Sequence, residues 1–200
     1  AYRTLTEWIV SNQQRLNEEN IKEIIEPLLE SFFSSAWAYN ARLNSIRSLG
    51  IQIPEDVIKS ASRWVEDENE TYSNLADAMD DVDAHPSRLL KLINFIDTQL
   101  FEKKVVVFTD QPETFDGFYQ MLVSAFGEEV TRFGAEVDST ENEMNIYRFQ
   151  SDPTCKILIC DKTGGEGRNL QIADYVVHID LPWNINTIEQ RIGRLDRMGR

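Results

Sequence analysis

Basic side chains recur at regular spacing in the last ten residues of an otherwise acidic sequence. Arg191, Arg194 and Arg197 lie three residues apart in IEQRIGRLDRMGR, so on a helix they drift slowly around one face and can converge on one polyanion. Guanidinium groups suit phosphate oxygens and stay charged at any physiological pH. Two interpretations remain open here: a dedicated anion site, or a solvated basic helix face paired with Glu189 and Asp196.

A second candidate is the glycine-rich segment TGGEGRN, which follows the apolar run KILICD. Gly164, Gly165 and Gly167 predict a backbone in conformations closed to other residues, with its N–H groups close to a phosphate. A tight connection between a strand and a helix, in which the glycines only permit the turn, explains the segment equally well. The segment is not a Walker loop, because no GKT or GKS follows, and it lacks the G-x-G-x-x-G spacing of a dinucleotide site.

Strands and helices that could place these two segments together are predicted in the second half of the chain. The strand candidates are KKVVVFTD, EVTRF, KILICD and YVVHID, and the helices between them are SRLLKLINFIDTQL, PETFDGFYQMLVSAF and STENEMNIYRF. Thr140 and Glu143 predict a capping box for the third helix, and Asn186 or Thr187 begins another helix. This alternation predicts an α/β fold with an open parallel sheet and helices on both faces. Ligands bind such sheets at the carboxyl ends of the strands, where both segments would open.

The first part of the chain, residues 1–84, predicts an all-helical segment, because apolar residues recur three and four apart. Pro27 should begin a helix at its first turn or kink a long one, and Gly50 followed by Pro54 marks a stop and a restart. We expect three or four helices before residue 80. The acidic stretch 66–83 predicts a solvated helix face or a mobile linker, and the domain boundary is placed between residues 1–84 and 85–200.

Composition limits the classes of function. The 200 residues carry a net charge of −14 with 42% apolar residues, and no run approaches the roughly 18 apolar residues of a membrane span. Nucleic-acid binding through bulk electrostatics is disfavoured, so any such binding must be local. No secretory signal is visible, which predicts a cytoplasmic protein. Cys155 and Cys160 fit neither a disulfide framework nor a zinc site and are expected to be reduced packing residues.

The sequence EGRNLQIADYVVHIDLPWN, followed by IEQRIGRLDRMGR, resembles motifs V and VI of the second RecA-like lobe of superfamily-two helicases. It is most similar to the Swi/Snf-related, RapA-like branch of these proteins. KKVVVFTD resembles motif IV, SRLLKLINFI resembles the helix before it, and LLESFFSSAWAYNARL is similar to a helical segment between the two lobes. The resemblance implies a RecA-like fold over residues 87–200.

The resemblance also implies roles for single residues. Arg194 and Arg197 occupy the positions of arginine fingers, which neutralise charge on the transferring phosphoryl group of an ATP held by the other lobe. Gln190 begins the same motif, although it could instead close a capping box with Thr187. Residues implied at the ATP site and inter-lobe cleft are Gln190, Glu166, Gly167 and Asn169, and those implied at the nucleic-acid backbone are Lys162, Thr163, Gly164, Gly165 and Arg168.

The partners implied are an N-terminal ATP-binding RecA-like lobe of the same protein and double-stranded nucleic acid, with DNA expected. ATP and Mg²⁺ would be bound mainly by that other lobe, because no Walker lysine loop and no DEAD-like or DExH-like motif occurs in the 200 residues. We therefore expect the C-terminal part of an ATP-dependent helicase or translocase, inactive alone. The alternative is a stand-alone interaction or regulatory module whose acidic helices meet a basic partner.

The sequence departs from the family pattern in two places. An arginine that the family places near Asn142 is missing, and only Arg148 lies close to that position. The last residue of motif VI, commonly glutamine, is Arg200.

Overall fold

The computed structural model describes residues 1–12, 21–165, 170–181, 186 and 189, and the structural statements below concern those residues. The chain divides into two compact units, Ala1–Asn74 and Leu75–Arg200. Each unit is described separately.

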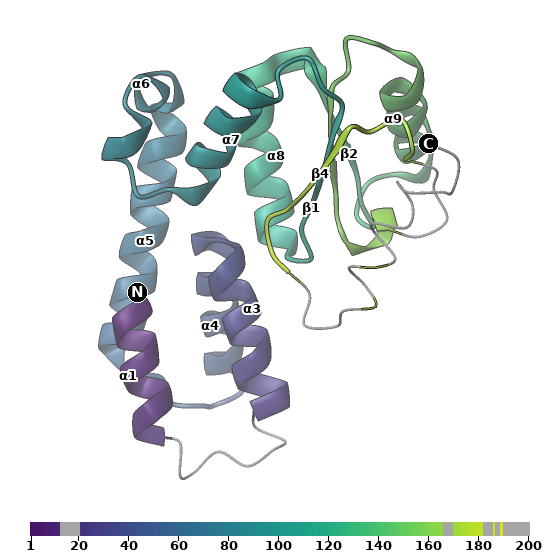
Figure 1. Ribbon diagram of the computed structural model, residues 1–200. Helices are drawn as coiled ribbons and strands as arrows, with labels where there is room; N and C mark the ends of the chain where they lie inside the picture. Colours follow the sequence, from purple (N-terminus) through teal and green to yellow (C-terminus); the bar gives the residue numbers. More distant parts are fainter. Residues whose placement is uncertain (13–20, 166–169, 182–185, 187–188, 190–200) are drawn as a thin grey trace. The chain divides into compact units, whose positions relative to one another are not determined.

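The first unit is built of helices, which Figure 1 draws in purple to blue. They are α1 (Tyr2–Asn12), a π-helical segment (Ile21–Ile25), α3 (Glu26–Ser34), α4 (Ala36–Ser48) and α5 (Glu55–Ser73). Pro27 lies in the first turn of α3, and Gly50, with φ of 80°, follows α4, so both predicted boundaries are confirmed. Their core is one cluster containing Leu5, Leu28, Tyr39, Leu43, Ile46, Val57 and Ala61.

The number of helices in this region differs from the expectation, whereas the acidic stretch matches one of its two expected forms. Among the residues that the structure describes, five α-helices, not three or four, begin before residue 80, because α6 (Leu75–Asp80) follows α5 and because Ser35 separates α3 from α4. Ser35 has an extended backbone and its side chain accepts a hydrogen bond from Ala38 N at 3.1 Å, so it caps α4 inside what looks like one continuous helix. The acidic stretch is helical as far as Ser73, with Glu66, Asp67 and Glu70 exposed, which agrees with the expected solvated helix face and not with the alternative of a mobile linker.

The second unit contains a four-stranded sheet with the order β2-β3-β1-β4, in which all pairs are parallel. The strands are β1 (Val105–Phe108), β2 (Val130–Phe133), β3 (Ile157–Cys160) and β4 (Tyr175–His178). The connecting helices are α7 (Arg88–Gln99), α8 (Pro112–Phe126) and α9 (Ser139–Ser151). The α/β fold and the four predicted strands are confirmed.

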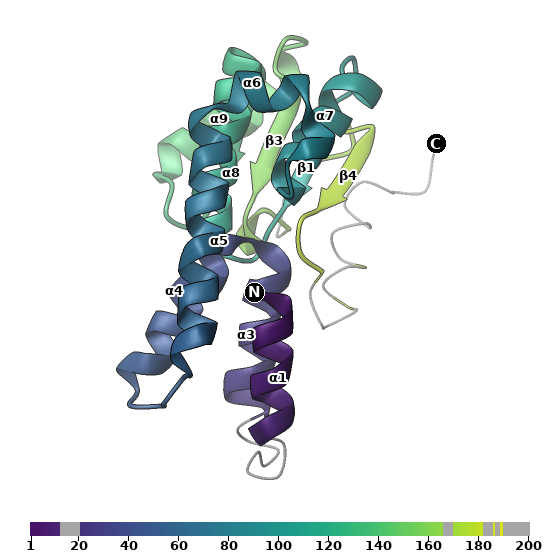
Figure 2. The same cartoon turned by 90° about the vertical axis from the view of Figure 1, so that its left-hand side faces the viewer.

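Burial explains the apolar strands. Every residue of β1 and β3 is buried, as their β-branched runs predict. Val106, Phe108 and Leu158 pack in one cluster with Ile146 and Phe149 of α9. In Figure 1 the strands lie between α8 on one side and α9 on the other, and Figure 2 views the sheet face-on, with β3, β1 and β4 side by side. Cys155 and Cys160 are buried and belong to this cluster, which agrees with the expectation of packing residues.

The ends of α9 are fixed by two side chains. Asp138 is the N-cap and accepts from the backbone N–H groups of Thr140 and Glu141 at 2.8 and 3.3 Å, so the predicted capping box starting at Thr140 is wrong. An aspartate at the true helix boundary satisfies the first N–H groups before Thr140 can do so. These bonds hold the pKa of Asp138 below its usual value.

At the carboxyl end of α9, the Lys104 ammonium donates to the carbonyls of Phe149, Asp152 and Cys155 at 2.6, 2.8 and 2.7 Å. It also lies 4.9 Å from the centre of the Phe149 ring. Burial lowers the pKa of Lys104, while nearby negative charge opposes that effect. Lys104 thereby connects the start of β1 to the end of α9.

No helix among the described residues is both long and apolar enough to cross a membrane.

Candidate nucleic-acid interface

The carboxyl ends of the four strands lie at one edge of the sheet. Phe108, the last residue of β1, is in register with Cys160 and with His178, and Cys160 is in register with Phe133. All four strands therefore end at the same level. Figure 2 shows β3, β1 and β4 pointing in the same direction. This is the edge where an open parallel sheet binds its ligands.

The loop after β3 is a short 3-10 turn, Lys162–Gly165, organised by the preceding aspartate. Asp161 Oδ1 accepts from Thr163 N at 2.8 Å and from Thr163 Oγ1 at 2.5 Å. Gly164 N donates to the Asp161 carbonyl at 3.1 Å. The backbone N–H groups of Thr163 and Gly164 are thus used inside the turn, whereas the Lys162 side chain is exposed.

Gly164 is required by packing and not by a special backbone conformation. Its φ lies outside the left-handed region, which among the described glycines is adopted only by Gly50 and Gly127. A Cβ at Gly164 would lie 2.5 Å from Cys160 Cβ and 2.7 Å from Cys160 Sγ. The expectation of a conformation closed to other residues is therefore wrong at this position, and the steric reason is that the turn folds back onto the end of β3.

Asp161 also reaches the loop after β2. Its Oδ2 accepts from Ala135 N at 2.7 Å. The neighbouring Gly134 is held from α9, because Asn142 Oδ1 accepts from Gly134 N at 3.1 Å and Asn142 Nδ2 donates to Gly134 O at 2.8 Å. The loops after β2 and β3 are consequently joined by one carboxylate.

Asp180 makes the corresponding connection between the loops after β4 and β1. It is buried, with 6% of its surface exposed. Its Oδ2 accepts from Thr109 Oγ1 at 2.6 Å and its Oδ1 from Asp110 N at 2.9 Å. Sequence reasoning missed both Asp161 and Asp180. The available signal was an aspartate one or two residues after a predicted parallel strand, where the N–H groups of neighbouring loops lie at the sheet edge.

The predicted site residues divide into two groups. Lys162, Thr163, Gly164 and Gly165 lie together in the turn after β3. The remaining predicted site residues lie outside the described residues: Glu166, Gly167, Arg168, Asn169, Gln190, Arg194 and Arg197.

Arg148 does not replace the arginine expected near Asn142. It donates to the Glu128 carbonyl, and its guanidinium lies 3.2 Å from the Glu128 carboxylate and 3.9 Å from that of Asp152. Those partners come before β2 and β3, at the opposite end of the strands. Asn142 itself connects α9 to the loop after β2, so the described residues near that position offer an amide in place of a guanidinium.

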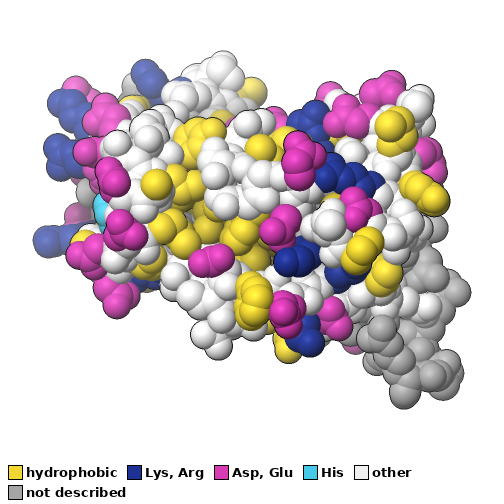
Figure 3. All heavy atoms as spheres, turned by 90° about the horizontal axis from the view of Figure 1, so that it is seen from above, with side chains coloured by type: hydrophobic (Ala, Val, Ile, Leu, Met, Phe, Trp, Pro, Cys, Tyr) yellow, Lys and Arg dark blue, Asp and Glu magenta, His cyan; other side chains and the backbone are white. Residues whose placement is uncertain are grey.

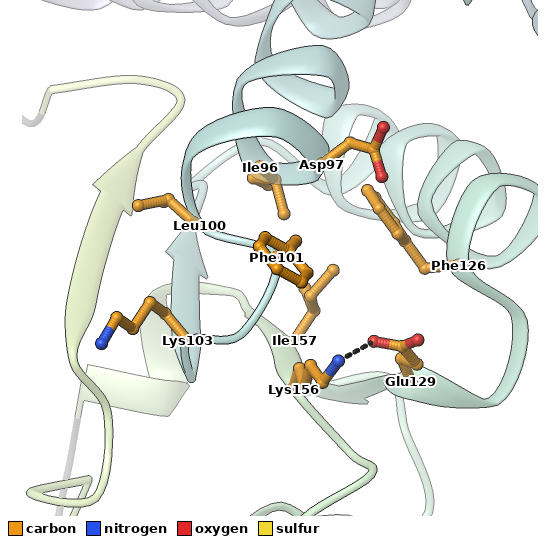
Figure 4. Close-up of a pocket in the computed structure, with 9 residues that line it drawn as sticks. All are labelled: Ile96, Asp97, Leu100, Phe101, Lys103, Phe126, Glu129, Lys156 and Ile157. Carbon is orange, nitrogen blue, oxygen red and sulfur yellow. Dashed lines mark ion pairs between the residues drawn. The ribbon is translucent and has the colours of Figure 1, made fainter.

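A cavity of about 120 Å³ lies at the amino ends of the strands, away from these loops (Figure 4). Ile96, Phe101, Phe126 and Ile157 contribute apolar walls, and Lys156 pairs with Glu129 at 3.2 Å. In the part of the chain that the structure describes, no three His, Cys, Asp or Glu side chains gather as metal ligands would.

Figure 3 views the structure from above, from the side of the amino ends of the strands and not of the loops that follow them. On this face Lys and Arg side chains are interspersed with Asp, Glu and hydrophobic side chains, in keeping with the net charge of −14.

Residues 85–199 match the protein family described as "Helicase conserved C-terminal domain". Among solved structures, the C-terminal domain of the Sulfolobus solfataricus SWI2/SNF2 ATPase is 28% identical and is matched over 49% of this chain and 44% of its own, with a TM-score of 0.43. The Hef helicase domain of Pyrococcus furiosus is 22% identical over 94% of this chain and 41% of its own, with a TM-score of 0.49. The S. solfataricus SWI2/SNF2 ATPase core in complex with double-stranded DNA is 20% identical over 84% of this chain and 35% of its own, with a TM-score of 0.47. The chain spans less than half the length of each of these proteins.

Proposed function

Because the chain belongs to the family of helicase conserved C-terminal domains, we propose that it forms the second lobe of an ATP-dependent nucleic-acid helicase or translocase of the Swi/Snf-related, RapA-like branch. In this proposal the lobe works with an ATP-binding lobe of the same protein that holds ATP and Mg²⁺, and it is inactive without that lobe. Its nucleic acid is double-stranded DNA.

The observation that carries the nucleic-acid contact is the turn after β3. The carboxyl edge of a parallel sheet presents Lys162 to solvent, next to a carboxylate that already accepts three hydrogen bonds. The N–H groups of Thr163 and Gly164 donate inside the turn, so the first contact with a backbone phosphate falls to the Lys162 ammonium. Thr163, Gly164 and Gly165 then serve to hold the turn, and Arg168 is the second proposed phosphate partner.

The proposed hydrolytic role belongs to Arg194 and Arg197, which would contact ATP across the cleft, with Gln190, Glu166, Gly167 and Asn169 lining that cleft. An arginine finger stabilises charge that develops in the transition state, so its loss lowers turnover far more than ATP affinity. Lysine should restore little activity, because an ammonium lacks the planar fork of a guanidinium.

The test uses the protein that contains both lobes. We expect Arg194→Ala or Arg197→Ala to reduce nucleic-acid-stimulated ATP hydrolysis by roughly 10³-fold or more, with ATP affinity changed much less. Arg191→Ala, in the same basic segment, is the matched control and should retain most turnover. Wild-type turnover in both finger variants would contradict the proposed role and favour a solvated basic face.

A further inference from the structure

We propose that Asp161 is a positioning residue for the nucleic-acid contact: its carboxylate ties the turn after β3 to the loop after β2 and thereby fixes where Lys162 meets a phosphate. This inference rests on the proposed function of the lobe. Asp161 need not touch the nucleic acid, because its effect passes through the turn.

The geometry gives the two carboxylate oxygens different tasks. Oδ1 closes the local turn by accepting from the N–H and the hydroxyl of Thr163 at 2.8 and 2.5 Å. Oδ2 accepts from Ala135 N at 2.7 Å, which lies 26 residues earlier in the sequence and follows a different strand. The second bond joins two loops, and the backbone N–H of Asp161 also donates to the Phe133 carbonyl at the end of β2 at 3.2 Å. The side-chain bond extends this connection from the strand ends into the loops.

The loop after β2 is a firm anchor for this bond. The Asn142 side chain accepts from the backbone N–H of Gly134 and donates to the Gly134 carbonyl. It also donates to the Val137 carbonyl at 3.1 Å. A Cβ at Gly134 would lie 2.9 Å from Phe115 Cζ and 3.2 Å from Asp161 Oδ2. The absence of a side chain at Gly134 therefore permits the close approach of Asp161 to Ala135.

The hydrogen bonds to Asp161 also reduce the repulsion between its carboxylate and a bound phosphate. A carboxylate beside a phosphate-binding lysine would repel the phosphate. Three donors, however, spread the negative charge of Asp161 into the turn and the neighbouring loop. Lys162, the next residue, is exposed and can meet the polyanion.

A second aspartate in the chain, Asp152, provides a matched control for the turn at Asp161. Asp152 precedes β3 and forms the same local turn, since its Oδ1 accepts from Thr154 N at 2.8 Å and from Thr154 Oγ1 at 2.6 Å. Its Oδ2 lies 3.9 Å from Arg148 Nε and not at the backbone of another strand loop. Asp152 and Asp161 thus share the local turn but differ in the bond between loops.

The experiment compares Asp161→Asn with Asp152→Asn in the protein containing both lobes. In asparagine one of the two carboxylate oxygens is replaced by an NH2 group, a donor that would face either Ala135 N–H or Thr163 N–H in place of an acceptor. We expect Asp161→Asn to raise the duplex DNA concentration that gives half-maximal stimulation of ATP hydrolysis by about tenfold. That is the scale of losing one hydrogen bond to a charged group. Unstimulated hydrolysis and the rate at saturating DNA should stay within about twofold of wild type.

A set of three threonine variants keeps the inference testable if Asp161→Asn does not fold. Thr163→Val removes the hydroxyl donor and should raise the half-saturating DNA concentration severalfold, Thr163→Ser should restore it, and Thr154→Val is the control at the other turn. Faster hydrogen exchange of the Ala135 amide in Asp161→Asn would support the loss of the bond between loops.

The outcomes separate the two hypotheses. If wild-type protein hydrolyses ATP under DNA stimulation but Asp161→Asn has the same half-saturating DNA concentration as Asp152→Asn, the positioning role is overturned and the proposed function stands. If wild-type protein shows neither stimulation nor DNA binding, the proposed function fails and this inference fails with it. An equal loss of melting temperature in both variants, with a DNA effect only at Asp161, supports the inference.

Discussion

At Gly164 the backbone comes so close to β3 that no side chain fits. We expect Gly164→Ala to lower the free energy of unfolding by about 1–3 kcal/mol, because the added Cβ would overlap Cys160 Cβ, an atom that cannot rotate away. Urea unfolding of the chain measures the effect. The double variant Gly164→Ala/Cys160→Ala retains the Cβ contact and removes only the Sγ contact, so it should not recover wild-type stability. Full recovery would show that the sulfur alone sets the requirement.

The residues that organise the sheet edge were the hardest to predict. Lys162 and Gly164 stand out in the sequence because a charge and glycines interrupt an apolar pattern. Asp161 and Asp180 do not stand out, because an aspartate after a strand also suits an ordinary turn. Their importance comes from donors far away in the sequence, at Ala135 and Thr109. Single-sequence patterns carry no information about such pairs.

At the scale of elements, the strands were predictable and the helix boundaries only partly so. The apolar runs that form β1 and β3 can be recognised as strands in the sequence, because a strand buried on both faces needs continuous apolar residues. The ends of the helices depend on single polar residues, and neighbouring polar residues compete to cap the first backbone N–H groups of a helix. Asp138 caps α9 ahead of Thr140, and Ser35 interrupts the helical pattern between α3 and α4. Periodicity alone cannot choose among such neighbours.

The carboxyl end of α9 provides a test at this scale. Lys104→Met keeps much of the side-chain volume but leaves three carbonyls without their cationic donor, so we expect the free energy of unfolding to fall by about 2 kcal/mol. Lys103→Met is the control, because the neighbouring Lys103 side chain is exposed and should contribute no more than about 0.5 kcal/mol. Equal effects of the two substitutions on the urea midpoint would mean that the three bonds contribute nothing measurable.

The molecule as a whole contains two compact units, and the family match covers only the second. The family match covers residues 85–199, whereas the helical unit Ala1–Asn74 lies outside it and has its own apolar core. The charge is also unevenly distributed, with a net −9 in residues 1–84 and −5 in residues 85–200. An acidic molecule can still bind nucleic acid, provided that a few cations lie where the fold collects ligands.

This charge balance makes the contact measurable through its salt dependence. Because few cations act against a net charge of −14, binding of duplex DNA to the chain should be weak and should fall steeply with salt. Lys162→Gln should weaken binding about equally for all DNA sequences and reduce the slope of log K against log salt by about 1, the signature of one lost phosphate contact. Lys103→Gln carries the same charge change in the loop before β1, at the opposite end of the strands, and should leave the slope unchanged. Fluorescence anisotropy over a salt series measures both variants. Equal slopes for Lys162→Gln and wild type would remove Lys162 from the interface, whereas an equal reduction in both variants would show that overall charge, and not the turn after β3, governs the binding.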